Sequence, residues 1–216
     1  MATKPDRLLG LVRGSEDSID SDASRGAVLD GALEAFLDLG MRRTSMGDIA
    51  RRTGISPATL YRRFASKSSV VQAVGLREVR RFLADADDLL AELNEQGADV
   101  ETLLTELALA VIDGSRRNKL LQRLLRTEPE IVLPMLTING GAVIDLGREY
   151  LTDFIHGLQR QGRLPSYDAE PIAEVMARLA VSFVLTEQSV IALDDPDAAR
   201  AAIRSFLVPA VTQAGG

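Results

Sequence analysis

A cluster of basic side chains lies between Met41 and Lys67. This segment of 27 residues holds seven Lys and Arg residues against one acidic residue, Asp48, and so carries a charge of +6. The whole chain has a net charge of −6, so the other residues together carry −12. A compact basic segment on an acidic body indicates one face that meets a polyanion such as nucleic acid. The basic residues are Arg42, Arg43, Arg51, Arg52, Arg62, Arg63 and Lys67.

The other side chains of this segment also suit nucleic acid. Neutral hydroxyls that can donate to phosphate oxygens occur at Ser45, Ser56, Thr59 and Tyr61. Arg62 and Arg63 carry forked donors that can reach a phosphate or the O6/N7 edge of guanine. Pro57 and Ala58 are small, which lets a helix start approach the bases closely. We therefore interpret the segment as a DNA-binding surface, with a solvated basic helix as the alternative.

The composition excludes several kinds of catalytic and metal site. The chain has no Cys, so it forms no disulfide, thiolate zinc site or cysteine nucleophile. Its single histidine, His156, cannot build a His-rich metal site within one chain. A small helical enzyme that works through carboxylates is the remaining catalytic alternative, but Asp85, Asp87 and Asp88 are typical of a solvated helix face. We expect no enzymatic activity, no metal and no cofactor.

Strong local signals predict two short helices in the basic segment. Ser45 and Asp48 have the spacing of a capping box, which begins a helix that Gly54 ends. Ser56-Pro57 begins the next helix, because Ser is a preferred N-cap and Pro suits the first helical position. This helix runs to about Phe64. The sequence thus predicts a helix-turn-helix, in which the second helix enters the major groove of DNA.

Apolar residues spaced by three and four predict helices along the rest of the chain, and no segment alternates like a strand. The expected fold is all-α with about nine helices, at 24–39, 45–54, 57–64, 66–93, 100–116, 119–126, 133–161, 169–191 and 197–211. Residues 1–20 show no periodicity, and we expect a flexible arm there. No signal sequence or membrane span is evident, because the uninterrupted apolar run 107–112 is far too short. We expect a cytoplasmic protein without a membrane partner.

The sequence of the basic segment closely resembles that of a known family, with many matching residues at fixed spacing. The matching runs are 44–50, 54–56 and 59–64, followed by Lys67, and they resemble the N-terminal domain of the tetracycline-repressor (TetR) family. The resemblance covers about residues 24–75. The family often has His before the Phe that ends the recognition helix, whereas this chain has Arg63, a difference that bears on DNA sequence preference.

The resemblance implies a role for individual residues of this segment. The family positions that bind phosphates correspond to Ser45, Thr59, Tyr61 and Lys67. Positions near bases match Ser56, Pro57, Ala58 and Arg62. The small core that sets the angle between the two helices matches Ile49, Ala50, Ile55, Leu60 and Phe64. The complete set of expected DNA contacts is Arg43, Thr44, Ser45, Met46, Ser56, Pro57, Ala58, Thr59, Tyr61, Arg62, Arg63 and Lys67.

The resemblance also implies a division into domains. Residues 21–75 would form the DNA-binding domain, and residues 76–216 a helical ligand-binding and dimerisation domain. The last two helices are apolar nearly all round, which indicates burial on several sides. The expected homodimer interface comprises Ile172, Val175, Leu179, Ser182, Phe183, Ile203, Phe206 and Leu207. The alternative is that these residues only complete the core of one protomer.

A pocket for a small molecule is expected in the second domain. The candidate lining residues are Leu103, Leu107, Met135, Ile138, Phe154, Leu158 and Met176, with plain core packing as the alternative. Arg116 and Arg117 could meet an anionic ligand, although surface charge is the simpler reading. Only 4% of residues are aromatic, which disfavours an aromatic cage for a large cation.

These observations converge on a bacterial one-component transcriptional regulator. We expect a homodimeric repressor that binds a near-palindromic double-stranded DNA operator and is released by a small, largely apolar effector. When bound to DNA it would be associated with the nucleoid. The alternative is a DNA-binding regulator that is independent of ligand or controlled by a protein partner. A non-specific architectural DNA-binding protein would be basic over most of its length, which the acidic body opposes.

Overall fold

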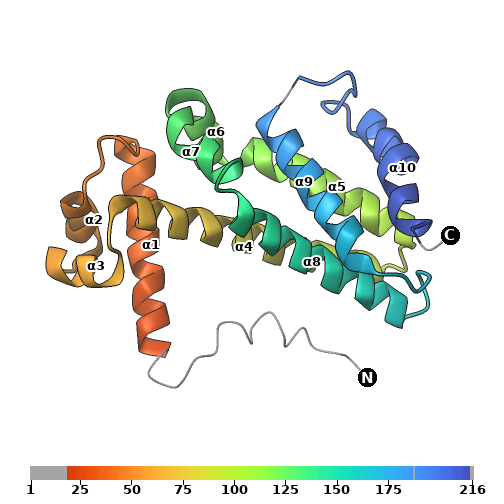
Figure 1. The fold of residues 1–216 in the computed structure, drawn as a ribbon, viewed down its shortest axis with the longest axis horizontal. Coiled ribbons are helices and arrows are strands. Elements are labelled where there is room, and N and C mark those ends of the chain that lie inside the picture. Colours follow the sequence, from red (N-terminus) through yellow and green to blue (C-terminus); the bar gives the residue numbers. More distant parts are fainter. Residues whose placement is uncertain (1–18, 187, 215–216) are drawn as a thin grey trace. The chain divides into compact units, whose positions relative to one another are not determined.

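The computed structural model describes residues 19–186 and 188–214, which form helices and turns without a strand. This confirms the predicted all-α class, with ten helices in the described chain rather than about nine (Figure 1). They are α1 (Ile19–Leu39), α2 (Met46–Thr53), α3 (Pro57–Arg63), α4 (Lys67–Glu95), α5 (Val100–Arg117), α6 (Lys119–Thr127), α7 (Pro129–Leu136), α8 (Gly141–Arg160), α9 (Ala169–Leu185) and α10 (Pro196–Thr212). Residues 1–18 of the predicted arm lie outside the described residues, and α1 begins five residues before the expected Ser24.

The additional helix comes from the region 129–160. The sequence predicts one bent helix over 133–161, whereas the structure has α7 and α8 at an angle of 49° to each other. The turn between them is tight, because a Cβ atom on Gly140 would lie 3.0 Å from the carbonyl oxygen of Thr137. Only glycine fits this turn without a shift of the backbone. The glycine therefore separates two helices here, rather than bending one.

The chain divides into two compact units with the boundary between Gly75 and Leu76, so α4 contributes to both. The core of the first unit draws on all four of its helices. Phe36 from α1, Ile49 from α2, Leu60 from α3 and Val70 and Val74 from α4 are each at most 1% exposed. Burying a side chain of this kind stabilises the fold by about 1.5–3 kcal/mol. This shared core holds α2 and α3 at their mutual angle.

In the second unit, α5 packs against α9 and α10, and α8 packs along α9 (Figure 1). Leu103 of α5 and Ile155 of α8 are at most 1% exposed. Small residues let α8 and α9 approach closely, since a Cβ atom on Gly147 would lie 3.3 Å from that of Ala177. Among the described residues, no single helix is long and apolar enough to span a membrane, although α7 and α8 taken together meet that length and composition.

Candidate nucleic-acid interface

The N-terminus of α2 has the predicted capping box. The Ser45 hydroxyl accepts the Asp48 amide at 3.1 Å, and the Ser45 amide donates to the Asp48 carboxylate at 2.9 Å. The Ser45 hydroxyl also donates to that carboxylate at 2.6 Å. These hydrogen bonds from Ser45 are the main reason that the pKa of Asp48 lies below its ordinary value. The nearby Arg51 guanidinium lowers this pKa further. The hydroxyl proton of Ser45 is therefore used within the cap, and the expected phosphate contact would have to compete with it.

The turn between α2 and α3 depends on one glycine and one hydroxyl. Gly54 has a φ of +70°, in the left-handed region that favours glycine, and its amide bonds the Ala50 carbonyl. Ser56 then caps α3, its hydroxyl accepting the Thr59 amide at 3.1 Å. Pro57 occupies the first turn of α3, where its missing N–H costs nothing. Gly54, Ser56 and Pro57 therefore determine where α3 begins and which residues lie on its first turn.

Helix α3 packs through one face and leaves the other to solvent. Leu60 is fully buried and Phe64, which follows the helix, is 3% exposed. Tyr61 is 54% exposed, and Arg62 and Arg63 are exposed beside it. The remaining expected contacts on this helix start, Pro57, Ala58 and Ser56, are also exposed, and Thr59 is half-buried. The structure thus gathers the expected base and phosphate contacts of α3 on one solvent-facing helix.

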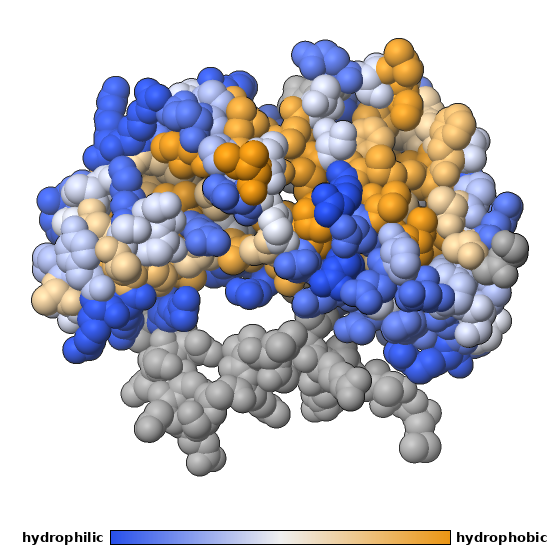
Figure 2. Space-filling view, viewed as in Figure 1, coloured by the Kyte–Doolittle hydropathy of each residue, from blue (hydrophilic) through white to orange (hydrophobic). Residues whose placement is uncertain are grey.

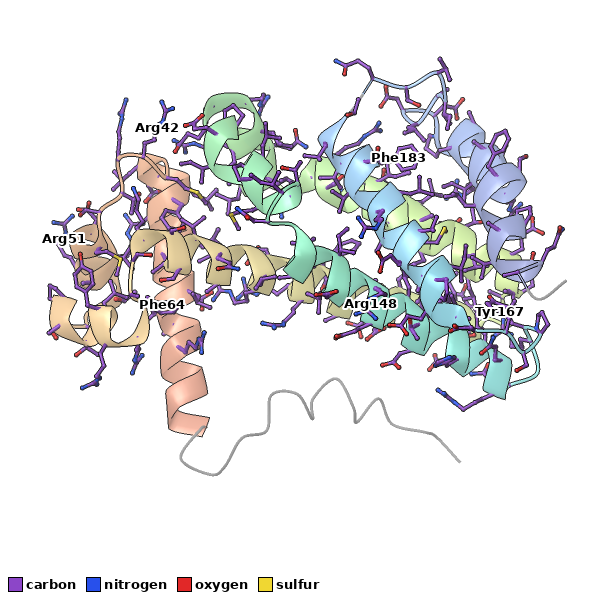
Figure 3. The ribbon with its side chains drawn as sticks, viewed as in Figure 1. Arg42, Arg51, Phe64, Arg148, Tyr167 and Phe183 are labelled. Carbon is purple, nitrogen blue, oxygen red and sulfur yellow. The ribbon has the colours of Figure 1, made fainter. Side chains whose placement is uncertain are left out.

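Basic side chains elsewhere in the unit differ in their ion pairs. Arg51 lies 2.5 Å from Asp48, and Arg52 lies 2.5 Å from Asp38 of α1. Arg43 and Arg62 are exposed and form no ion pair among the described residues. Figure 3 shows Arg42 in the loop between α1 and α2, and Arg51 on α2, pointing away from the core of the unit. The positive charge not balanced by a neighbouring carboxylate therefore includes the loop before α2 and the outer face of α3.

Two of the expected DNA contacts are core residues instead. Thr44 is 1% exposed, and its hydroxyl donates to the carbonyl oxygens of Gly40 at 2.7 Å and Ala35 at 3.1 Å. Met46 is 7% exposed. Buried side chains of this kind cannot reach a DNA backbone, so Thr44 and Met46 hold the loop before α2. A sequence pattern cannot separate them from Ser45, because the chain alternates between inward and outward positions within three residues.

The ammonium of Lys67 is also used inside the unit. Its Nζ lies 2.8 Å from the carbonyl oxygen of Met41, 3.0 Å from that of Thr44 and 3.2 Å from that of Arg42. An ammonium has three N–H donors, and these carbonyl groups account for all of them. Lys67 therefore ties the first turn of α4 to the loop between α1 and α2. The expected phosphate contact would require at least one of these bonds to be given up.

One contact in this unit was not foreseen from the pattern of basic residues. The guanidinium of Arg25, on α1, lies 5.5 Å from the centre of the Phe64 ring. A cation over an aromatic face is attracted by the ring quadrupole. Arg25 and Phe64 lie 39 positions apart in the sequence. Spacing along one helix gives no signal for such a pair.

The expected pocket residues of the second unit differ widely in exposure. Leu103, Leu107 and Leu158 are core residues at 0%, 4% and 3% exposure, whereas Ile138 is 86% exposed. The other candidates, Met135, Phe154 and Met176, are half-buried. The structure instead describes a cavity of about 300 Å³ beside α5 and the start of α10, and none of these seven residues lines it. Periodicity marks buried faces but does not say where packing leaves space.

The expected interface residues divide between surface and core. Val175 and Leu179 of α9 are 50% and 38% exposed, and Phe206 of α10 is 71% exposed. Ser182 is exposed, and Ile172, Phe183 and Leu207 are half-buried. Ile203 is 3% exposed, so it belongs to the core of the protomer and not to a surface. Figure 2 shows apolar residues gathered over α9 and α10.

Known protein families match the sequences of both units. Residues 28–74 match the family described as bacterial regulatory proteins, tetR family, and residues 99–209 match the bacterial tetracycline repressor C-terminal domain. The regulator TtgR of Pseudomonas putida is 28% identical over 172 residues, covering 77% of this chain and 80% of its own. An uncharacterised HTH-type transcriptional regulator of Mycobacterium tuberculosis is 27% identical over 167 residues, covering 77% and 83%.

Solved structures share the fold. The TetR family repressor AlkX from a Dietzia strain, implicated in n-alkane biodegradation, has a TM-score of 0.66 at 22% identity, covering 87% of this chain and 94% of its own. The repressor QsdR of R. erythropolis has a TM-score of 0.62 at 16% identity, covering 89% and 95%. With a helix-turn-helix that presents basic residues to solvent and both domains matched, the chain belongs to the TetR family of DNA-binding transcriptional regulators.

Proposed function

We propose that this regulator is a homodimeric repressor that binds a near-palindromic operator and responds to a small-molecule effector. The observation that carries the proposal is the outer face of α3, where Tyr61, Arg62 and Arg63 are exposed while Leu60 anchors the helix. An exposed helix with forked donors suits the major groove, whose base edges carry a distinct pattern of acceptors. The relatives AlkX and QsdR, which share the fold, are described as repressors.

The DNA contacts that we propose follow from side chains that reach solvent on α3 and in the loop before α2. Thr59 and Tyr61 offer hydroxyls, and Arg43 and Arg63 offer guanidinium groups, to phosphates. Ser56, Pro57, Ala58 and Arg62 lie at the start and outer face of α3, close to base edges in such a docking. The expected contacts Thr44, Ser45, Met46 and Lys67 are left out of this set, because burial or internal hydrogen bonds occupy their side chains.

A dimer follows from the apolar surface of α9 and α10. Phe206, Val175 and Leu179 would each expose apolar area to water in a lone protomer. Transfer of apolar surface from water stabilises an interface by about 25 cal/mol per Å² before the costs of association. A symmetric dimer buries the same patch on both protomers and presents two α3 helices to two half-sites.

Ligand response would act through a shift of population between two arrangements of the dimer. Helix α4 contributes residues to both units, so a change in the second unit can reach Lys67 and the loop that it holds. An effector that prefers the arrangement unsuited to operator spacing lowers operator affinity by the ratio of its two binding constants.

The test is the selection of bound DNA fragments from the source genome with purified protein. We expect an enriched inverted repeat, and we expect affinity for it to fall by about 10³–10⁴ between 50 and 200 mM salt, as for contacts with 6–8 phosphates. Arg62→Ala should alter sequence preference, whereas Tyr61→Phe should weaken all sequences alike. Uniform enrichment with a flat salt response would refute an operator-specific regulator.

A further inference from the structure

The cavity beside α5 combines an apolar wall with arginine side chains. Leu89 of α4, Leu109 of α5 and Leu193 of the segment before α10 contribute apolar surface. Arg116 and Arg117 of α5 and Arg200 of α10 contribute guanidinium groups to the same cavity. Its volume of about 300 Å³ lies at the lower end of the range of small-molecule sites, roughly 300–1,000 Å³.

The three arginines differ in how strongly their carboxylate partners hold them. Arg200 bonds both carboxylate oxygens of Glu106, at 2.7 and 3.4 Å, and the Glu106 side chain is only 23% exposed. This pair ties α10 to α5. Because both oxygens of Glu106 already have a donor, a cationic ligand would have to displace Arg200 to reach it.

Arg116 is bound much more loosely. Its side chain is 29% exposed, and its guanidinium lies 2.8 Å from Asp194, whose side chain is 95% exposed. Its other bond goes to the Leu193 carbonyl at 3.0 Å. An ion pair with so exposed a partner stabilises the protein by at most about 1 kcal/mol, because water screens the carboxylate. A ligand carboxylate can take the place of Asp194 at this guanidinium while Asp194 returns to water.

We propose that this cavity binds a small amphipathic carboxylate. The ligand carboxylate takes the forked donors of Arg116, a geometry that guanidinium groups match. Its apolar body lies on the leucine wall, where contact with water is lost. Arg117, whose side chain is 77% exposed and pairs with Asp113 at 3.2 Å, also lines the cavity and adds positive charge.

The site lies where a ligand can act on α10. Leu193 and Asp194 lead directly into that helix, and Arg200 lies on it. A ligand that replaces Asp194 releases one ion pair between α5 and this segment. This consequence for regulation rests on the proposed function, in which the outer face of α10, with Phe206, belongs to the dimer interface. The binding itself does not depend on that function.

The experiment is calorimetric titration of the full chain, without DNA, with octanoate and phenylbutanoate. Octanol serves as the probe without charge, and acetate as the probe without an apolar body. We expect both amphipathic acids to bind and both control probes to bind at least about tenfold more weakly. Octanol loses the charged hydrogen bond, and acetate loses buried methylene groups worth about 0.8 kcal/mol each. Failure of both acids, or equal binding of octanol and octanoate, overturns the proposal.

Three variants of the cavity and one control variant outside it locate the site. Arg116→Gln should weaken octanoate at least about tenfold, whereas Arg126→Gln, on an exposed side chain of α6 outside the cavity, should leave it unchanged. Ala110→Leu should fill the cavity and abolish binding without lowering the thermal unfolding temperature. Asp194→Asn should tighten binding about two- to fivefold, a gain that a misfolded variant cannot show. Octanoate affinity that is unchanged in all three variants places the ligand elsewhere and refutes this site.

A parallel titration of operator DNA separates the two proposals. Operator binding without any carboxylate binding refutes the cavity site but supports the proposed function as a DNA-binding regulator. Carboxylate binding that requires Arg116 but leaves operator affinity unchanged supports the site and refutes its role as the effector site.

Discussion

Burial divides the polar side chains of the helix-turn-helix into those used in folding and those that we propose contact DNA. Thr44 is 1% exposed and bonds two carbonyl groups, whereas Tyr61 is 54% exposed. Lys67 is half-buried and satisfies three carbonyl groups. Each polar group buried without a partner would cost about 1–3 kcal/mol, so these internal bonds are part of what holds the loop before α2 in place.

Lys67→Met should show which role the ammonium has. Methionine keeps the aliphatic stem but loses the three hydrogen bonds, so we expect the free energy of unfolding to fall by about 1–3 kcal/mol. The slope of log affinity against log salt should stay unchanged, as measured by titration of operator DNA. Arg43→Gln is the matched comparison, with its slope reduced by about 1.8 per dimer if each Arg43 contacts one phosphate. A comparable reduction in Lys67→Met would assign Lys67 to a phosphate instead.

Asp48 makes the capping box of α2 sensitive to acid. Hydrogen bonds from Ser45 and the nearby Arg51 lower the pKa of Asp48 below its ordinary value of 3.8. A lowered folded-state pKa contributes stability that is present above the ordinary value and is lost as the pH falls through the lowered pKa. Wild-type protein should therefore unfold at a higher temperature than Asp48→Asn near pH 7, and the difference should shrink below pH 3.8. A constant difference at all pH values would show that charge on Asp48 is not involved.

At the scale of elements, the turn between α2 and α3 decides which face the second helix presents. Gly54 adopts a left-handed conformation, and nothing lies within 4 Å of the position of an added Cβ atom. The need for glycine at this position is therefore conformational and not steric. The position of Gly54 immediately after α2 allows the chain to reverse into Ser56 and α3 within two residues.

Gly54→Ala should destabilise the first unit by about 1–2 kcal/mol, the cost of a left-handed conformation for a residue with a Cβ atom. Gly47→Ala is the matched control, because Gly47 lies within α2, where alanine is favoured over glycine by up to about 1 kcal/mol. Chemical denaturation of both variants measures the two effects. Destabilisation by Gly54→Ala that is no larger than that by Gly47→Ala would show that the left-handed conformation does not limit the turn.

At the scale of the whole molecule, α9 and α10 divide their apolar residues between core and surface. Ile203 and Phe206 lie three positions apart on α10, yet one is 3% exposed and the other 71%. The inward residue stabilises the protomer, and the outward residue is available to a second copy of the chain. This division would allow one pair of helices to complete a core and also offer the proposed dimer interface.

Phe206→Glu should abolish the proposed dimer while leaving the protomer folded. A buried charge without a partner is strongly unfavourable in an apolar interface, whereas the same charge is solvated on a lone protomer. Light scattering after size exclusion would measure the mass, and circular dichroism the helix content. Ser205→Glu, an exposed neighbour on α10, is the control that should remain dimeric. A dimer that persists in Phe206→Glu would exclude this face of α10 from the interface.

The amino-acid sequence by itself determined the helical class, both short helices of the DNA-binding unit and the residues that cap them. Such features depend on neighbours within about four positions, as with Ser45 and Asp48 or Ser56 and Thr59. The basic segment could be found for the same reason, since charge is counted along the chain. The family resemblance also spans this segment, where many positions match at fixed spacing.

Only the tertiary structure decided which of these polar groups are used in folding and where space remains between helices. Lys67 meets carbonyl groups more than 20 positions away, and Arg116 meets Asp194, which lies 78 positions further along the chain. The cavity, the burial of Ile203 and the break at Gly140 likewise depend on which elements face each other. Local spacing marks a residue as apolar or polar, but the packing of distant segments determines what that residue touches.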